Sequence, residues 1–178
     1  MRVGEDEFGA LVERHQPAVF RWAVALVGDS DDAEDVTQEV FVRAYRKLGT
    51  FRGDGTLEGW LYRITRSVVS RHRTKAQRRL RLDASPAARS THEIYVTDPG
   101  ARVDRENAMA LIREIVFTLP MRQREVFVLC DLQGRSPAEV AGMLDMNDVS
   151  VRASLFKART AVRRTVLRSH PRYREDAE

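Results

Sequence analysis

The sequence predicts an all-α protein made of two small helical domains joined by a flexible linker. Apolar residues recur at three- and four-residue spacing in both halves of the chain, which is the period of amphipathic helices. Between these halves, residues 83–99 have no sustained period and contain Pro86 and Pro99. A stretch of about twenty residues without periodicity is unusual inside a compact domain and typical of a linker. The expected division is a first domain over residues 1–82, a linker over 83–103, a second domain over 104–170 and a tail over 171–178.

The first two helices are predicted from their breaks and caps. The first should end at Gly28, a typical C-cap, and Pro17 should start a new turn or kink it. The second should begin at the capping-box spacing of Asp31 and Glu34. Polar groups flank one apolar side chain on its outer face: Asp35, Gln38, Glu39 and Val42. Such a face either meets water or docks a partner, and the pattern alone leaves both open.

The third helix, over about residues 57–81, has the most uneven charge in the chain. It follows a flexible glycine loop, and Thr56 is its expected N-cap. After Glu58 no acid appears until Asp83, whereas basic residues accumulate: Arg63, Arg66, Arg71, Arg73, Lys75, Arg78, Arg79 and Arg81. One face is apolar and another carries Tyr62, Arg66, Ser70 and Arg73. An aromatic-bearing helix with a basic outer face suits a nucleic-acid backbone, and the loop beside it could hold an unstacked base. The alternative is a basic face that only meets water, with Trp60 and Tyr62 as ordinary core residues.

A helix-turn-helix is predicted in the second domain. Ser136 and Glu139 have capping-box spacing with Pro137 at the first helical position, which predicts a short helix. A turn over residues 145–148 and a long helix follow, with small and basic residues on its outer face. A helix of this kind can enter a DNA major groove, although a helical hairpin that packs on a protein has the same outline.

Composition excludes several classes of protein. The net charge of the 178 residues is only +4, but acids crowd residues 29–39 and bases crowd the third helix, which favours two different partners. The single cysteine, Cys130, excludes an internal disulfide and lies in an apolar run typical of a buried thiol. No membrane span or signal peptide is evident, so we expect a cytoplasmic protein without direct membrane insertion. Four scattered histidines and the lack of a catalytic, metal or cofactor motif argue against an enzyme and predict no cofactor.

Taken in order, three runs of sequence resemble the extracytoplasmic-function (ECF) type of sigma factor, in the sigma-70 family of RNA polymerase sigma factors. Residues 28–45 are similar to the family's core-polymerase-binding region, and residues 51–64 to its region that melts the promoter and reads the −10 element. Residues 119–159 look like its helix-turn-helix domain, which reads the −35 element. The competing reading is a stand-alone helix-turn-helix regulator that binds an operator, which would leave the first domain without a purpose.

The resemblance implies a transcription initiation factor, not an enzyme, that joins RNA polymerase core and directs it to promoters. Implied partners are the clamp and flap regions of core polymerase, promoter DNA that is double-stranded at −35 and single-stranded at −10, and an anti-sigma factor. Core binding would fall to Asp35, Gln38, Glu39 and Val42. The −10 residues would be Phe51, Arg52, Trp60, Tyr62, Arg63, Arg66, Ser67, Ser70 and Arg73. The −35 residues would be Ser150, Arg152, Ala153, Ser154, Phe156, Lys157 and Thr160.

The chain departs from the family's pattern at a few positions. Ser67 stands where an Asn is common, Arg71 lies near a common Asp, and Ser154 replaces a frequent Arg. The usual Pro-x-Gly-Thr turn reads Asn-Asp-Val-Ser here, and Asn147 or Asp148 is the expected cap of the recognition helix. We therefore expect an unusual promoter sequence within the same class of protein.

Overall fold

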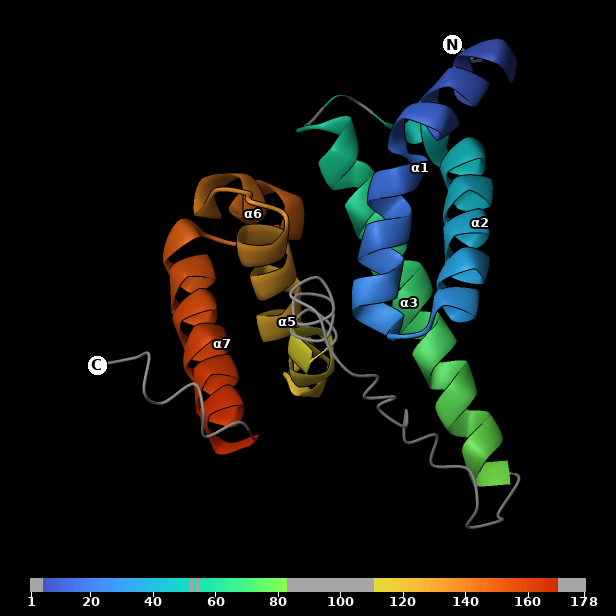
Figure 1. The fold of residues 1–178 in the computed structure, drawn as a ribbon. Coiled ribbons are helices and arrows are strands. Elements are labelled where there is room, and N and C mark those ends of the chain that lie inside the picture. The colour runs from blue at the N-terminus through green and yellow to red at the C-terminus, as the bar shows by residue number, and fades with distance from the viewer. Residues whose placement is uncertain (1–4, 52, 54, 83–110, 170–178) are drawn as a thin grey trace, which may run out of the picture.

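Two helical bundles lie side by side in the computed structural model, which describes residues 5–51, 53, 55–82 and 111–169 (Figure 1). The first bundle contains α1 (Glu5–Val27), α2 (Ser30–Lys47), the short 3-10 helix η1 (Leu48–Thr50) and α3 (Leu57–Leu82). The second contains helical turns over residues 111–118, α5 (Met121–Phe127), the π-helical segment η2 (Val128–Leu132), α6 (Pro137–Leu144) and α7 (Asp148–Ser169). The described part of the chain has no strand, so the all-α prediction is confirmed. The predicted linker, the tail and Arg52 lie outside the described residues.

Apolar residues on one stripe of each helix build the core. In the first bundle Trp22, Leu26, Val36, Val40 and Leu61 are essentially fully buried. The second bundle contributes a further buried group: Val126, Leu129, Val140, Val151 and Ala158. Both groups belong to one continuous hydrophobic cluster. The two bundles are therefore packed against each other through apolar side chains as well as within themselves.

The predictions for α1 and for the start of α2 are confirmed only in part. Gly28 ends α1 with φ +90°, as a C-cap glycine should. Pro17 lies inside α1, which continues as a single helix, so of the two expected alternatives, a new turn or a kink, the new turn is wrong. The predicted capping box at Asp31 is wrong, because Asp29 is the N-cap of α2 and its carboxylate accepts from the backbone N–H groups of Asp31 and Asp32. An aspartate can satisfy two of the orphan donors of a helix start without a partner acid.

Other predicted caps are confirmed. Thr56 Oγ1 accepts a hydrogen bond from Gly59 N at 3.1 Å at the start of α3. Ser136 and Glu139 form the full capping box of α6, with Pro137 in the first turn. Asn147 caps α7, since its Oδ1 accepts from Ser150 N at 2.7 Å. Cys130 is buried, as predicted, and burial raises the pKa of its thiol.

Candidate nucleic-acid interface

A basic pocket lies between the C-terminal half of α2 and the first half of α3. The pocket has a volume of about 460 Å³. Its lining is Arg43, Arg46, Lys47, Thr50, Trp60, Arg63, Ile64, Ser67 and Arg71. Five cations and no acid surround one large aromatic ring and two hydroxyl groups. This combination suits a nucleotide whose phosphate meets the cations while its base stacks on the ring.

Trp60 is held in place from the side of the glycine loop. The rings of Phe51 and Trp60 lie with centroids 5.4 Å apart and planes inclined by 47°. Both residues are partly buried, and Trp60 also packs against the core of the first bundle. Trp60 therefore has one surface fixed by neighbours and another open to the basic pocket. Arg63 and Ser67 follow it on α3 and are exposed.

The predicted −10 residues do not share one surface. Phe51, Trp60, Arg63 and Ser67 gather at or beside the basic pocket, and Ser70 is exposed farther along α3.

Arg66 and Arg73 instead contact the second bundle, at Glu125 and Met121, and Tyr62 is buried. Tyr62 is 1% exposed, so it is an ordinary core residue, which is one of the two alternatives that the sequence left open, and its placement on a basic outer face of α3 is wrong. Its ring packs edge-on to Trp22 of α1, with centroids 5.2 Å apart.

The exposed face of α2 lines a second pocket beside the basic one. Asp35, Gln38, Glu39 and Val42 are all exposed, as predicted, and line it together with residues of α3. Val42 is 46% exposed, which is high for an apolar side chain on a helix whose opposite side is buried. Glu39 pairs with Arg43 across one helical turn at 2.6 Å, and Arg43 also lines the basic pocket. Arg43 and Arg71 therefore line both this acidic face of α2 and the basic pocket.

The helix-turn-helix is formed by α6 and α7. The turn between them holds Asp145 in the left-handed conformation, with φ 53°. Every predicted outward residue of α7 remains accessible: Arg152, Ala153, Phe156, Lys157 and Thr160 are exposed, and Ser150 and Ser154 are half-buried. Phe156 is 73% exposed and has no apolar cover on this face. An exposed phenylalanine among small and basic residues can contact a thymine methyl group in a major groove.

The recognition helix is fixed to the domain by a bidentate ion pair. Arg159 donates two hydrogen bonds to Asp131, at 2.9 Å from Nε and 2.6 Å from Nη2. Asp131 holds the pKa of Arg159 above its usual range, so the guanidinium stays charged. Near the start of the helix, Arg152 pairs with Asp148 at 2.6 Å. Arg152 would have to leave this partner to reach a base or a phosphate.

Sequence reasoning missed two sets of residues. Arg43, Arg46 and Lys47 were not singled out, although they lie on the basic pocket. The sequence does carry a signal for them, because the helix starts with acidic residues and ends with basic ones. The helix dipole alone favours the same pattern. The second set is Arg124 and Glu125, which are only 2% and 1% exposed. No sequence pattern predicts that a pair of charged residues is buried.

Comparison with known proteins agrees with this geometry. The family model for sigma-70 region 2 matches residues 11–79, and the model for sigma-70 region 4 matches residues 109–162. The chain is 33% identical over 170 residues to the ECF RNA polymerase sigma-E factor of Escherichia coli, covering 89% of this chain and 85% of that protein. This chain belongs to the sigma-70 family. It is an ECF-type sigma factor.

Further relatives support the same assignment. The RNA polymerase sigma-H factor of Pseudomonas aeruginosa is 29% identical over 161 residues, which cover 87% of this chain and 83% of that protein. The fold matches that of the sigma factor RpoE of Bartonella quintana, solved in complex with the anti-sigma factor NepR. That match has a TM-score of 0.67 and 19% identity, over 89% of this chain and 95% of RpoE. The sigma factor is therefore a transcription initiation factor and not a stand-alone operator-binding regulator.

The described residues lack two other kinds of feature. None of the helices in this part of the protein is long and apolar enough to cross a membrane. Within the same residues, no cluster of histidine, cysteine and acidic side chains could hold a metal ion.

Proposed function

We propose that this sigma factor docks on RNA polymerase core through the exposed face of α2 and traps an unstacked −10 base in the basic pocket. The observation that carries the proposal is the position of Trp60 within a ring of five cations contributed by both α2 and α3. Stacking of a base on an aromatic ring is worth about 1–3 kcal/mol, which is comparable with the cost of unstacking it from a duplex. Promoter melting would then need no nucleotide hydrolysis.

The helix-turn-helix would supply the second contact. Its outer residues on α7 are accessible and basic, and the N-terminal end holds small side chains that allow close approach to base edges. Phosphate contacts by Lys157 and the neighbouring arginines would position the helix, while Arg152 and Phe156 would read the −35 sequence. In this proposal the domain boundaries are residues 1–82 and 104–170, with the linker over residues 83–103 between them.

A regulatory partner is also proposed. The structurally similar RpoE was solved with an anti-sigma factor, and we infer that an anti-sigma protein binds this chain as well. The proposed place of action is the cytoplasm, where core polymerase and promoter DNA meet.

Run-off transcription with purified bacterial core polymerase on a pooled library of genomic promoter fragments tests the proposal. Addition of the protein should create discrete start sites preceded by a shared two-part motif. Arg63→Ala should lower transcription from these sites roughly tenfold, because Arg63 lies on the basic pocket and contacts the unwound strand. Arg14→Ala, which removes the same charge from an exposed position on α1, should leave it unchanged. Absence of new start sites contradicts the function, and equal activity of the two variants contradicts the use of the pocket.

A further inference from the structure

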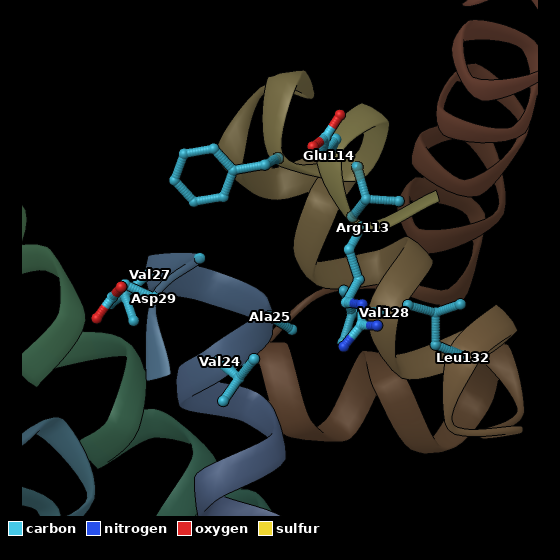
Figure 2. Close-up of a pocket in the computed structure, with 11 residues that line it drawn as sticks. Val24, Ala25, Val27, Asp29, Arg113, Glu114, Val128 and Leu132 are labelled. Carbon is cyan, nitrogen blue, oxygen red and sulfur yellow. The ribbon is translucent and has the colours of Figure 1, made fainter. Parts of the chain in front are cut away.

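Two large apolar side chains on α7 are the most exposed of their kind in the described part of the chain. Six such side chains are exposed there: Val42, Tyr45, Phe117, Leu132, Val149 and Phe156. Phe117 and Leu132 line a pocket of about 500 Å³ against α1 (Figure 2), and the Tyr45 ring packs edge-on against a phenylalanine of α1. Val149 and Phe156 are 75% and 73% exposed. These two residues therefore keep the largest share of their apolar surface in water.

Both side chains belong to one stripe along α7. Its members recur at four- and three-residue steps, which places them on one face of the helix. This apolar stripe consists of Val149, Ala153, Phe156 and Thr160, all of which are exposed. The Thr160 hydroxyl donates to the Phe156 carbonyl at 2.9 Å, so the methyl group of Thr160 is the part left for the outer surface. The outward face of α7 is therefore apolar over about three helical turns.

The arginines on one edge of the apolar stripe are already paired within the second bundle. Arg152 Nε lies 2.6 Å from Asp148, and Arg159 makes a bidentate pair with Asp131. In both pairs a carboxylate takes the donors with which a guanidinium recognises O6 and N7 of guanine. On the other edge, Lys157 is exposed and has no ion-pair partner among the described residues. The centre of this face thus lacks a donor for guanine, while a cation beside it remains for a phosphate.

Thymine is the base whose chemistry matches an apolar stripe in the major groove. It carries a C5 methyl group there, whereas guanine presents two acceptors and cytosine an amino donor. A donor or acceptor that the Phe156 ring covers without replacing its water disfavours a G·C pair at that place. Along the helix axis Val149 and Phe156 are about 10 Å apart, which corresponds to about three base-pair steps of DNA. The stripe is long enough to meet several methyl groups in a row.

We propose that the −35 site of this sigma factor contains a run of about three A·T base pairs, whose thymine methyl groups pack on the apolar stripe. The stripe reads the centre of the site, and Lys157 holds a neighbouring phosphate. Arg152 contacts a base only at the edge of the run, after it leaves Asp148. This inference rests on the proposed role of the helix-turn-helix, and it adds the class of DNA sequence that α7 selects.

The first part of the test is a selection of DNA duplexes with a random central window. The full-length protein, alone and together with core polymerase, selects the duplexes that it binds, and runs of thymine on one strand should be enriched. Enrichment of a G·C-rich sequence, or of no sequence, overturns the inference. Run-off transcription decides the proposed function separately, because start sites preceded by a G·C-rich −35 element support that function and reject the thymine run.

The second part changes only the methyl groups of the selected duplex. Uracil in place of each thymine of the run keeps the base pairs and the O4 acceptor but removes the C5 methyl group. The wild-type protein should bind the uracil duplex roughly tenfold more weakly, because full burial of one methyl group is worth about fourfold in affinity. Fluorescence anisotropy measures both affinities. Equal binding of the thymine and uracil duplexes overturns the inference, even where the selection returned A·T base pairs.

Three variants separate methyl contacts from charge. Phe156→Ala should lower the ratio of thymine to uracil affinity to about twofold, since the largest apolar contact is lost. Lys157→Ala should weaken binding to both duplexes by the same factor and leave the ratio unchanged, as a phosphate contact does. Tyr45→Ala removes an exposed aromatic ring from α2 and should change neither affinity. Circular dichroism should show the same helix content in all of these proteins.

The ratio of affinities gives the decisive comparison between the variants. A ratio that stays near the wild-type value in Phe156→Ala contradicts reading by the apolar stripe. A ratio that falls in Lys157→Ala as far as in Phe156→Ala also contradicts it, because the methyl preference would then depend on charge.

Discussion

Gly28 ends a helix of the first domain and also lies in the contact between the two domains. Its φ of +90° ends α1, and a Cβ atom built on it would lie 2.7 Å from the Phe117 ring of the second domain. Glycine is thus required there by backbone conformation and by close approach. Gly55, with φ +91°, has the same backbone requirement but no heavy atom within 4 Å of its virtual Cβ.

These two glycines form a matched pair for mutation. Both Gly28→Ala and Gly55→Ala should lower the free energy of unfolding by about 1 kcal/mol, because each forces an L-residue into a left-handed conformation. Gly28→Ala should additionally move the Phe117 ring aside and reduce energy transfer between dyes on the two domains. Urea titration measures the free energy of unfolding, and energy transfer reports the separation of the two domains. Equal energy transfer in the two variants would show that Phe117 does not need Gly28 for its contact.

Arg124 shows how a buried charge can be retained in such an interface. Desolvation and the nearby Arg73 lower its pKa to about 10, which leaves the guanidinium charged near neutral pH. Its side chain donates to the carbonyl oxygens of Leu26, Phe117 and Leu119, so the charge meets a ring of backbone acceptors. The sequence around Arg124 and Glu125 resembles that of the family, but this pattern does not indicate that both side chains are buried.

At the scale of elements, α6 is short and depends on its cap. Ser136 Oγ accepts from Glu139 N at 3.3 Å, and the Glu139 carboxylate accepts from Ser136 N at 2.8 Å. A helix of eight residues has little intrinsic stability, so the capping box and packing against α3 and α7 hold it. The hydrogen bonds from Ser136 lower the pKa of Glu139.

We expect Ser136→Ala to lower the free energy of unfolding by about 1 kcal/mol. It should also return the pKa of Glu139 toward its ordinary value, because the hydroxyl donor is lost. Because the pKa of Glu139 is lowered, the stability that its hydrogen bonds with Ser136 contribute is present above the unfolded-state pKa. It is lost as the pH falls through the folded-state pKa. Carbon NMR titration of the side-chain carboxyl groups and urea unfolding at neutral pH check the two effects. A Glu139 pKa that does not move in Ser136→Ala would contradict the role of the hydroxyl group.

At the scale of the whole molecule, the three proposed binding surfaces, on α2, α3 and α7, differ in how exposed they are. The acidic face of α2 and the outer face of α7 are open, whereas part of α3 is covered by the second domain. Core polymerase could therefore engage the protein first through α2. Because Glu39 holds Arg43, and Arg43 also lines the basic pocket, a partner that captures Glu39 would release a cation to the pocket.

Docking through α2 gives a prediction for the full chain. Asp35→Ala should weaken association with core polymerase roughly three- to tenfold, because the residue lies in the exposed pocket of that face. Glu34→Ala removes an equal charge from the neighbouring exposed position, which does not line the pocket, and should have little effect. Biolayer interferometry with immobilised core measures both. Similar affinities for the two variants would place the docking surface elsewhere.

The sequence alone determined the all-α class, the caps at Thr56 and Ser136, and the exposed positions of α2 and α7. Such features follow from local backbone hydrogen bonding and from helical periodicity, both of which operate over a few residues. The resemblance to ECF sigma factors, carried by motifs in order along the chain, also needed no structure.

Only the tertiary structure decided which basic residues come together and which are covered. Arg43 and Arg63 meet at one pocket although they lie on different helices, and Tyr62 is buried although its neighbours on α3 suggest a basic surface. The pairing of Arg66 with Glu125 spans both domains. Periodicity tells which side of a helix is apolar or charged, but not what packs on that side. The second domain supplies the missing partner, because burial of apolar surface brings segments together regardless of their separation in sequence.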